Sequence, residues 1–201
     1  MMRLYDNLDS GNGYKCRLAL NQLEIPFERI EIDIYKGDSR SPDFLRINPN
    51  GRIPVLEYEP GAYLAESNAI LFYLADGSPL LPGDRIGRAQ VLQWMCFEQY
   101  SHEPNIATSR NWLLHFAIDD QRRTALESKR EAGQAALGVM EGHLSGKRYF
   151  VGESYTIADI ALYAYTHVAE EGGFTLEPYP NIREWLARLT AEPRDIPITH
   201  G

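Results

Sequence analysis

Two polar side chains, Ser10 and Asn12, alternate with two glycines in the run Asp9–Gly13, near the start of the chain. A short apolar segment precedes this run and helical apolar spacing follows it over Tyr14–Leu23, so we expect a turn from a strand into a helix. A hydroxyl and an amide can donate hydrogen bonds, and the amino end of a helix favours a negatively charged partner. The chemistry expected at this turn is therefore the stabilisation of an anion.

A proline precedes a predicted strand in the stretch Ile53–Leu56. Pro54 cannot donate a hydrogen bond to a sheet, so it either begins the strand after a trans peptide bond or follows a cis bond. A cis bond would turn the backbone N–H and C=O groups of Ile53 outward, where they could pair with an extended peptide ligand. Taken alone, this stretch favours the trans alternative.

Glu66 and Ser67 open a predicted helix in the stretch Ala65–Ile70. Backbone N–H groups at a helix start attract anions, so Ser67 could hold a ligand carboxylate while Glu66 accepts a hydrogen bond from a ligand ammonium. The alternative is ordinary N-capping by Ser67, which is the commoner use of serine at this position. Taken alone, the stretch favours capping.

The stretch Tyr155–Ile160 predicts the start of a buried helix and carries no chemistry in our interpretation. Thr156 and Asp159 have the spacing of a capping box, and Tyr155 and Ile160 stand at the positions of a hydrophobic staple.

The composition is typical of a globular protein of one or two domains, with 201 residues, 44% of them apolar and 24% charged. A formal net charge of −8 argues against nucleic acid as a partner, because phosphate binding needs a basic surface. No apolar run approaches the ~18 residues that span a membrane, and no signal peptide is recognisable. Cys16 and Cys96 have neither metal nor redox spacing, so we expect a cytoplasmic protein without a metal centre.

The two halves of the chain have different patterns. Residues 1–76 predict a strand, a helix and a strand, then a connection, and finally two short strands and a helix. A short break at Glu59–Gly61 separates the last two strands, so they should be antiparallel. Residues 77–85 read as a linker, and residues 86–201 carry only helical spacing, which predicts an all-α domain.

The glycines at positions 11 and 13 also raise the alternative of a dinucleotide-binding fold, with Asp33 at the spacing that this fold requires. The third glycine of that motif is replaced by Cys16, and the chain turns helical where further strands would be needed. We therefore do not adopt this alternative.

The combination of NPNGRIPVL, AESNAILFYLA and VGESYTIADIALY, in this order and spacing, resembles the cytosolic glutathione transferases over essentially the whole chain. The resemblance implies a thioredoxin-like N-terminal domain that binds glutathione, followed by an all-helical C-terminal domain that shapes the site of the acceptor substrate. It also implies a homodimer, a role in detoxification, and glutathione as co-substrate.

The same resemblance implies roles for individual residues. The run from Ser10 to Lys15 is similar to that of a bacterial subgroup in which a Ser or Thr and the Asn of Asn-Gly approach the sulfur of glutathione. Gly11 stands where that subgroup often has proline, so the turn is less constrained. We expect Tyr5 to be a core or dimer-contact residue and Cys16 to be a buried apolar residue, rather than sulfur ligands.

The remaining parts of glutathione would be held by the other stretches. The backbone of Ile53, beside a cis bond to Pro54, would hold the cysteinyl part, and Glu66 and Ser67 would hold the γ-glutamyl end. Arg52 could reach the glycine carboxylate, with Lys36 as a weaker candidate. In the helical half, the residues that could line the acceptor site are His102 and Arg110, although each could equally be a polar residue at a helix end.

Three functions remain open at this point. The first is a glutathione S-transferase that adds the thiolate to small hydrophobic electrophiles. The second is a glutathione-dependent disulfide-bond oxidoreductase, which needs no protein cysteine if two glutathiones bind. The third is a non-catalytic interaction module of the same fold, which we rank last because Ser10 and Asn12 are both present.

Overall fold

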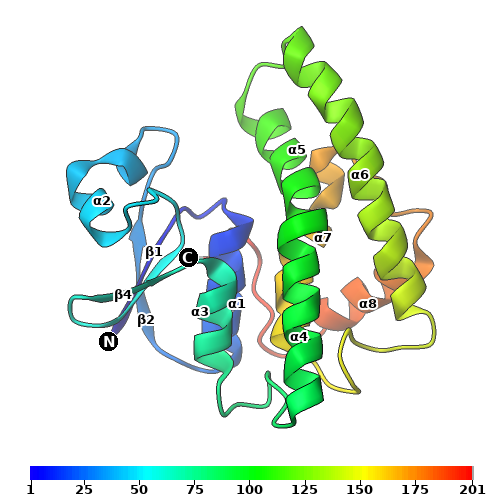
Figure 1. Cartoon of the computed structure of the whole chain (residues 1–201), viewed down its shortest axis with the longest axis horizontal. Helices are drawn as coiled ribbons and strands as arrows, with labels where there is room; N and C mark the ends of the chain where they lie inside the picture. The colour runs from blue at the N-terminus through cyan, green and yellow to red at the C-terminus, as the bar shows by residue number, and fades with distance from the viewer. Residues whose placement is uncertain (201) are drawn as a thin grey trace. The chain divides into compact units, whose positions relative to one another are not determined.

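The computed structural model describes residues 1–200 and divides into two compact units. The first unit comprises residues 1–79 together with the segment that begins at Pro193, and the second comprises Leu80–Glu192 (Figure 1). The sequence prediction assigned everything after the linker to the helical domain. The structure instead places the segment from Pro193 in the first unit, where Ile196 and Ile198 are buried.

The first unit contains one four-stranded mixed sheet in the order β2-β1-β3-β4. Strands β1 and β2 pair in parallel, whereas the pairs β1–β3 and β3–β4 are antiparallel, as the short break between the last two strands predicted. The elements of this unit are β1 (Met2–Asp6), α1 (Gly11–Gln22), β2 (Phe27–Glu31), η1 (Asp38–Arg40), α2 (Pro42–Ile47), β3 (Val55–Glu59), β4 (Ala62–Ala65) and α3 (Ser67–Ala75).

The two faces of this sheet are covered by different helices (Figure 1). Leu4 pairs with Leu56 across β1 and β3, and both side chains are fully buried. Because side chains alternate along a strand, the neighbouring pair Tyr5 and Val55 faces the other way and forms a core cluster with Phe44 of α2. Helices α1 and α3 lie together on the opposite side of the sheet from α2.

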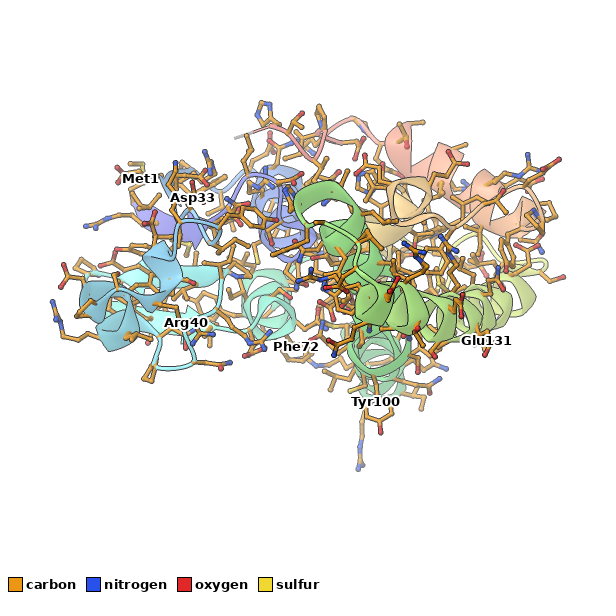
Figure 2. The ribbon with its side chains drawn as sticks, turned by 90° about the horizontal axis from the view of Figure 1, so that it is seen from above. Met1, Asp33, Arg40, Phe72, Tyr100 and Glu131 are labelled. Atoms are coloured by element: carbon orange, nitrogen blue, oxygen red, sulfur yellow. The ribbon has the colours of Figure 1, made fainter. Side chains whose placement is uncertain are left out.

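Strand β2 is shorter than the sequence alternation predicted. The alternation of Ile30, Ile32 and Ile34 with polar residues predicts a strand that continues to position 34, yet β2 ends at Glu31. The carboxylate of Asp33 accepts hydrogen bonds from the backbone N–H groups of the two residues at positions 35 and 36, which folds the chain into a turn. Figure 2 labels Asp33 on this connection.

The second unit is all-helical, as predicted. Every residue of α7 (Ile157–Thr166) is buried, so this helix lies inside the bundle. The other elements are α4 (Arg85–Phe97), η2 (Glu98–His102), α5 (Glu103–His115), α6 (Asp120–Leu144), η3 (Ala169–Gly172) and α8 (Pro180–Thr190).

Helical spacing over residues 86–100 predicts a helix there. In the structure α4 ends at Phe97, and a π-helical turn, η2, then joins it directly to α5. Tyr100, labelled in Figure 2, lies on this turn and is 89% exposed. In the part of the chain that the structure describes, no helix combines the length and the apolar character needed to cross a membrane.

The start of α7 confirms the predicted capping box. Thr156 caps the helix with its side chain, and the carboxylate of Asp159 accepts hydrogen bonds from the Thr156 backbone N–H at 2.9 Å and hydroxyl at 3.0 Å. Asp159 also accepts from the backbone N–H of Phe150 at 3.1 Å and the indole of Trp185 at 3.0 Å, which the sequence did not predict. This buried carboxylate therefore joins three segments of the helical unit.

Candidate functional site

Ser10 is the N-cap of α1. Its Oγ accepts a hydrogen bond from the backbone N–H of Gly13 at 3.2 Å, and its own N–H donates to the carbonyl of Asn7 at 2.9 Å. Accepting this bond leaves the hydroxyl proton available for donation, because a serine hydroxyl both donates and accepts. Helix α1 begins at Gly11, earlier than the predicted Tyr14, because Ser10 caps the helix at this point.

The amide of Asn12 has a defined orientation. Its Oδ1 accepts a hydrogen bond from Nζ of Lys15 at 2.8 Å and another from Oγ of Ser67 at 3.3 Å. Lysine can only donate, so the amide atom that faces Lys15 must be the oxygen. The amide nitrogen of Asn12 therefore points away from Lys15, as a donor at the amino end of α1.

Lys15 belongs to this candidate site through its bond to Asn12, although the sequence interpretation did not include it. Its side chain is fully buried, although a lysine in the first turns of a helix next to polar residues usually lies in solvent. Its ammonium adds positive charge to an end of α1 that the helix dipole already makes positive. The sequence signal was its position, three residues after Asn12, which places both side chains on one face of the helix.

The two alternative sulfur ligands have other roles in the structure. Cys16 is fully buried, and this burial, followed by the charge of Asp6, raises the pKa of its thiol. Tyr5 is a core residue whose hydroxyl donates to Glu57 at 3.2 Å. Burial, followed by the negative charge of Glu57, raises the pKa of Tyr5, so its hydroxyl stays protonated.

The peptide bond between Ile53 and Pro54 is cis, which decides between the two alternatives that the sequence left open. This bond immediately precedes β3, an inner strand of the sheet. Asn48 supports the same connection, because its Nδ2 donates to the carbonyl of Arg52 at 2.8 Å.

Glu66, not Ser67, occupies the N-cap position of α3, and its side chain makes no capping hydrogen bond. Glu66 is the N-cap of α3 and has a φ of 71°, a left-handed conformation that is unfavourable for a residue with a side chain. Ser67 is the first residue of the helix, and its hydroxyl donates across to Asn12 on α1. The capping alternative for Ser67 is therefore wrong. Unfavourable backbone conformations of this kind tend to be retained at functional sites.

The two cations proposed for the glycine carboxylate have different surroundings. Arg52 is exposed, at the end of the connection that leads to Pro54. Nζ of Lys36 lies 2.9 Å from the carboxylate of Asp33, and this hydrogen bond raises the pKa of the lysine and lowers the pKa of the aspartate. Lys36 thus has an acidic partner within the protein.

His102 and Arg110 are both buried in the helical unit. Thr166 donates its hydroxyl to the carbonyl of Leu162 at 2.6 Å, so its Oγ1 accepts the bond from Nε2 of His102 at 2.9 Å. Nε of Arg110 donates to the carboxylate of Glu171 at 2.6 Å. These contacts fix both side chains against other helices of the same unit.

The structure thus joins Asn12 and Ser67 directly and places Ser10 at the same end of α1. Within residues 1–200, no group of three or more His, Cys, Asp or Glu side chains is arranged to hold a metal ion. Two hydrogen-bond donors at a positive helix end are suited to stabilising a small anion, such as a thiolate.

The family model described as "Glutathione S-transferase, N-terminal domain" matches residues 1–76, and the model of the C-terminal domain matches residues 93–193. A crystal structure of a glutathione S-transferase from Pseudomonas fluorescens Pf-5 is 51% identical, with a TM-score of 0.97 and coverage of 99% of both chains.

Two further relatives are more distant. A glutathione transferase family member from Pseudomonas fluorescens Pf-5, with two glutathione molecules bound, is 31% identical, with a TM-score of 0.83 and coverage of 96% of this chain and 89% of the other. The disulfide-bond oxidoreductase YfcG of Escherichia coli K12 is 31% identical over 189 residues, covering 90% of this chain and 87% of YfcG. Because the two family models together match most of the chain, the protein belongs to the glutathione S-transferase family.

Proposed function

We propose that the chain is a glutathione S-transferase that activates the thiolate of bound glutathione for attack on small hydrophobic electrophiles. The observation that carries this proposal is the fixed amide of Asn12, which Lys15 and Ser67 orient at the same end of α1 that Ser10 caps. The thiolate, rather than the thiol, is the reactive nucleophile, so a site that stabilises the anion accelerates the reaction.

The expected energies are sufficient for this task. A free thiol has a pKa near ~8.5, and lowering it by about two units requires roughly 2.7 kcal/mol of preference for the anion. A hydrogen bond to a charged acceptor contributes about 1.5–3 kcal/mol. A helix amino terminus adds up to about 1 kcal/mol. Ser10, Asn12 and α1 can thus supply the shift without a general base.

The ligand would be held along its whole length by residues of the first unit. Ser67 would donate to the carboxylate of the γ-glutamyl part and Glu66 would accept from its ammonium. The backbone of Ile53, next to Pro54, would pair with the cysteinyl part, and Arg52 would face the glycine carboxylate. These four residues come from two connections of the first unit, the one that leads from α2 into β3 and the one that leads from β4 into α3.

The acceptor substrate is assigned to the helical unit, as in the family's general arrangement. His102 and Arg110 stay candidates for contacting it, although each would have to release or share its present contact with Thr166 or Glu171. A cytoplasmic homodimer with a role in detoxification completes the proposal.

A second candidate is glutathione-dependent reduction of disulfides. It is favoured by the similarity to YfcG and to a structure that contains two glutathione molecules. The reaction would need no protein thiol, because one bound glutathione could attack a mixed disulfide and a second could complete the exchange. The burial of Cys16 agrees with such a cysteine-independent route.

The test combines ligand binding with the ionisation of the bound thiol. Calorimetric titration with reduced and then oxidised glutathione measures affinity, and ultraviolet absorbance against pH gives the pKa of the bound thiol. We expect a pKa lowered by about two units in the wild-type protein, and a return of at least one unit in the combined variant Ser10→Ala, Asn12→Ala.

Ser41→Ala is the matched control. Ser41 caps α2 in the same way, accepting from the backbone N–H of Phe44 at 3.2 Å, so this variant loses an equivalent cap without touching α1. A bound thiol that ionises as in free glutathione would overturn the transferase proposal. Binding of neither form of glutathione would point instead to the interaction module, which we rank last. Rates with a chloronitroaromatic and with a mixed disulfide then separate the two enzymatic candidates.

A further inference from the structure

The segment of residues 193–200, here called the return segment, follows the helical unit but belongs to the first unit. Figure 1 shows it in red, running beside α1. It forms neither a helix nor a strand, and Ile196 and Ile198 are 8% and 9% exposed, whereas Pro197 and Thr199 between and after them are exposed. An irregular segment with alternate buried residues requires partners for its backbone groups.

Those partners lie on a single face of α1. The hydroxyl of Tyr14 donates to the carbonyl of Ile196 at 2.6 Å, and Nδ2 of Asn21 donates to the carbonyl of Arg194 at 2.7 Å. Between them, the guanidinium of Arg17 donates to the carbonyl of Ile198 at 2.8 Å and also to the carbonyl of His200. The three donors are spaced three and four residues apart, which places them on one side of the helix.

Arg17 also holds the loop that carries Ser10. Its Nη2 donates to the carbonyl of Leu8 at 2.7 Å, two residues before Ser10, and its Nε lies 2.9 Å from the carboxylate of Asp6 at the end of β1. The guanidinium is fully buried. A single side chain therefore joins the end of β1, the loop from β1 to α1, and the return segment.

A buried guanidinium is stable only when acceptors satisfy its donors in the geometry of a planar fork. Asp6 and Leu8 supply acceptors on one side of Arg17, and the return segment supplies those on the other. Without the return segment, Nη1 of Arg17 would lose the carbonyls of Ile198 and His200 as acceptors. The guanidinium would then have to turn toward water, which would move it away from the carbonyl of Leu8. The position of the loop thus depends on the return segment, whose carbonyls at Ile198 and His200 are 181 and 183 residues from Arg17 in the sequence.

We propose that the return segment, acting through Arg17, positions the β1–α1 loop so that the hydroxyl of Ser10 faces the sulfur of bound glutathione. Arg17 is then a positioning residue and does not touch the ligand itself. This inference rests on the proposed function of Ser10 as a sulfur ligand.

Two full-length variants test the proposal: one changes Arg17, and the other changes the return segment. Arg17→Lys keeps the positive charge, but one ammonium cannot reach Asp6, Leu8 and the return segment together. Ile198→Ser removes a buried apolar side chain, which loosens the return segment while every residue of the loop and α1 is unchanged. Asn21→Ala is the matched control, because it removes a bond from α1 to the return segment that does not involve Arg17.

The decisive readout is the pKa of the bound thiol, measured by ultraviolet titration of the folded protein saturated with glutathione. We expect a rise of about one unit in both test variants, equivalent to tenfold less thiolate well below the pKa, and no rise in Asn21→Ala. Affinity for S-methylglutathione, which has no ionisable thiol, should stay within about twofold, because Glu66 and Ser67 are untouched.

The possible outcomes distinguish this inference from the proposed function. If the wild-type protein lowers the thiol pKa but both folded variants retain the wild-type value, the inference is wrong and the proposed function stands. A rise of the thiol pKa by the same amount in Asn21→Ala would also overturn the inference, because the rise would then not depend on the bonds of Arg17. A wild-type protein that leaves the thiol pKa unchanged would refute the proposed function itself.

Discussion

The carboxylate of Asp6 occupies the space beside Gly13 in which any other residue would carry its side chain. A Cβ atom at position 13 would lie 1.5 Å from Oδ1 of Asp6 and 2.1 Å from its Cγ. The requirement for glycine here comes from this close approach between the end of β1 and the first turn of α1. The same approach sets the path of the loop that carries Ser10.

Gly13→Ala should therefore destabilise the protein and disturb the sulfur site together. Asp6 cannot move away easily, because it is fully buried and paired with Arg17, so the overlap should cost about 2–3 kcal/mol of unfolding free energy. Urea unfolding measures this change. Gly138→Ala is the control, since position 138 lies within α6 and a Cβ there meets nothing within 4 Å. It should be neutral or stabilising by up to about 1 kcal/mol, because alanine favours a helix.

The positive φ of Glu66 predicts that replacing this residue by glycine raises the stability of the protein and lowers its affinity for glutathione. Glu66→Gly should raise the unfolding free energy by about 1 kcal/mol, because glycine adopts this conformation without penalty, and should weaken glutathione binding about tenfold or more through loss of the carboxylate. Differential scanning calorimetry and isothermal titration calorimetry measure the two effects.

Two further variants separate backbone from charge at this position. Glu66→Gln should weaken binding without the gain in stability. Glu24→Gly, at a φ of 55° beyond the opposite end of α1, should leave glutathione affinity unchanged. A stable Glu66→Gly protein that binds glutathione as tightly as the wild type would show that Glu66 does not contact the ligand.

The raised pKa of the buried Asp159 carboxyl predicts that the stability of the protein depends on pH. Burial raises its pKa from 3.8 to about 6, although four hydrogen-bond donors oppose the rise. The native state thus binds a proton more tightly than the unfolded state, and the resulting stabilisation is complete below pH 3.8 and is lost as the pH rises through about 6. The contribution amounts to about 3 kcal/mol, at roughly 1.36 kcal/mol per pKa unit.

The measurement is the difference in unfolding free energy between the wild type and Asp159→Asn at a series of pH values. We expect this difference to fall as the pH rises from about 4 to 7, since asparagine does not titrate. Asp84→Asn controls for loss of a capping carboxylate, because Asp84 caps α4 at the surface by accepting from the N–H of Gly87 at 2.9 Å. A difference that stays constant or grows with pH would contradict the assigned cause.

Local patterns in the sequence were sufficient for much of the fold. The alternation of strands and helices in residues 1–76, the purely helical second half and the capping box at Thr156 all depend on spacing between near neighbours, and the structure confirms them. Ser10 was expected at the start of a helix for the same reason, because a cap is defined by the few residues that follow it.

Other features depend on residues far apart in the chain, and only the folded structure decided them. Ser67 donates to Asn12 across 55 positions, so no local pattern could distinguish this role from capping. Arg17 is buried because Asp6, Leu8 and the return segment surround it, although its helical context alone would place an arginine in solvent. The sequence thus determined which elements form and which side chains stand at their ends, since those depend on local backbone preferences. Tertiary packing determined which of these side chains meet and in what orientation, since a hydrogen bond between distant segments exists only once both are in place.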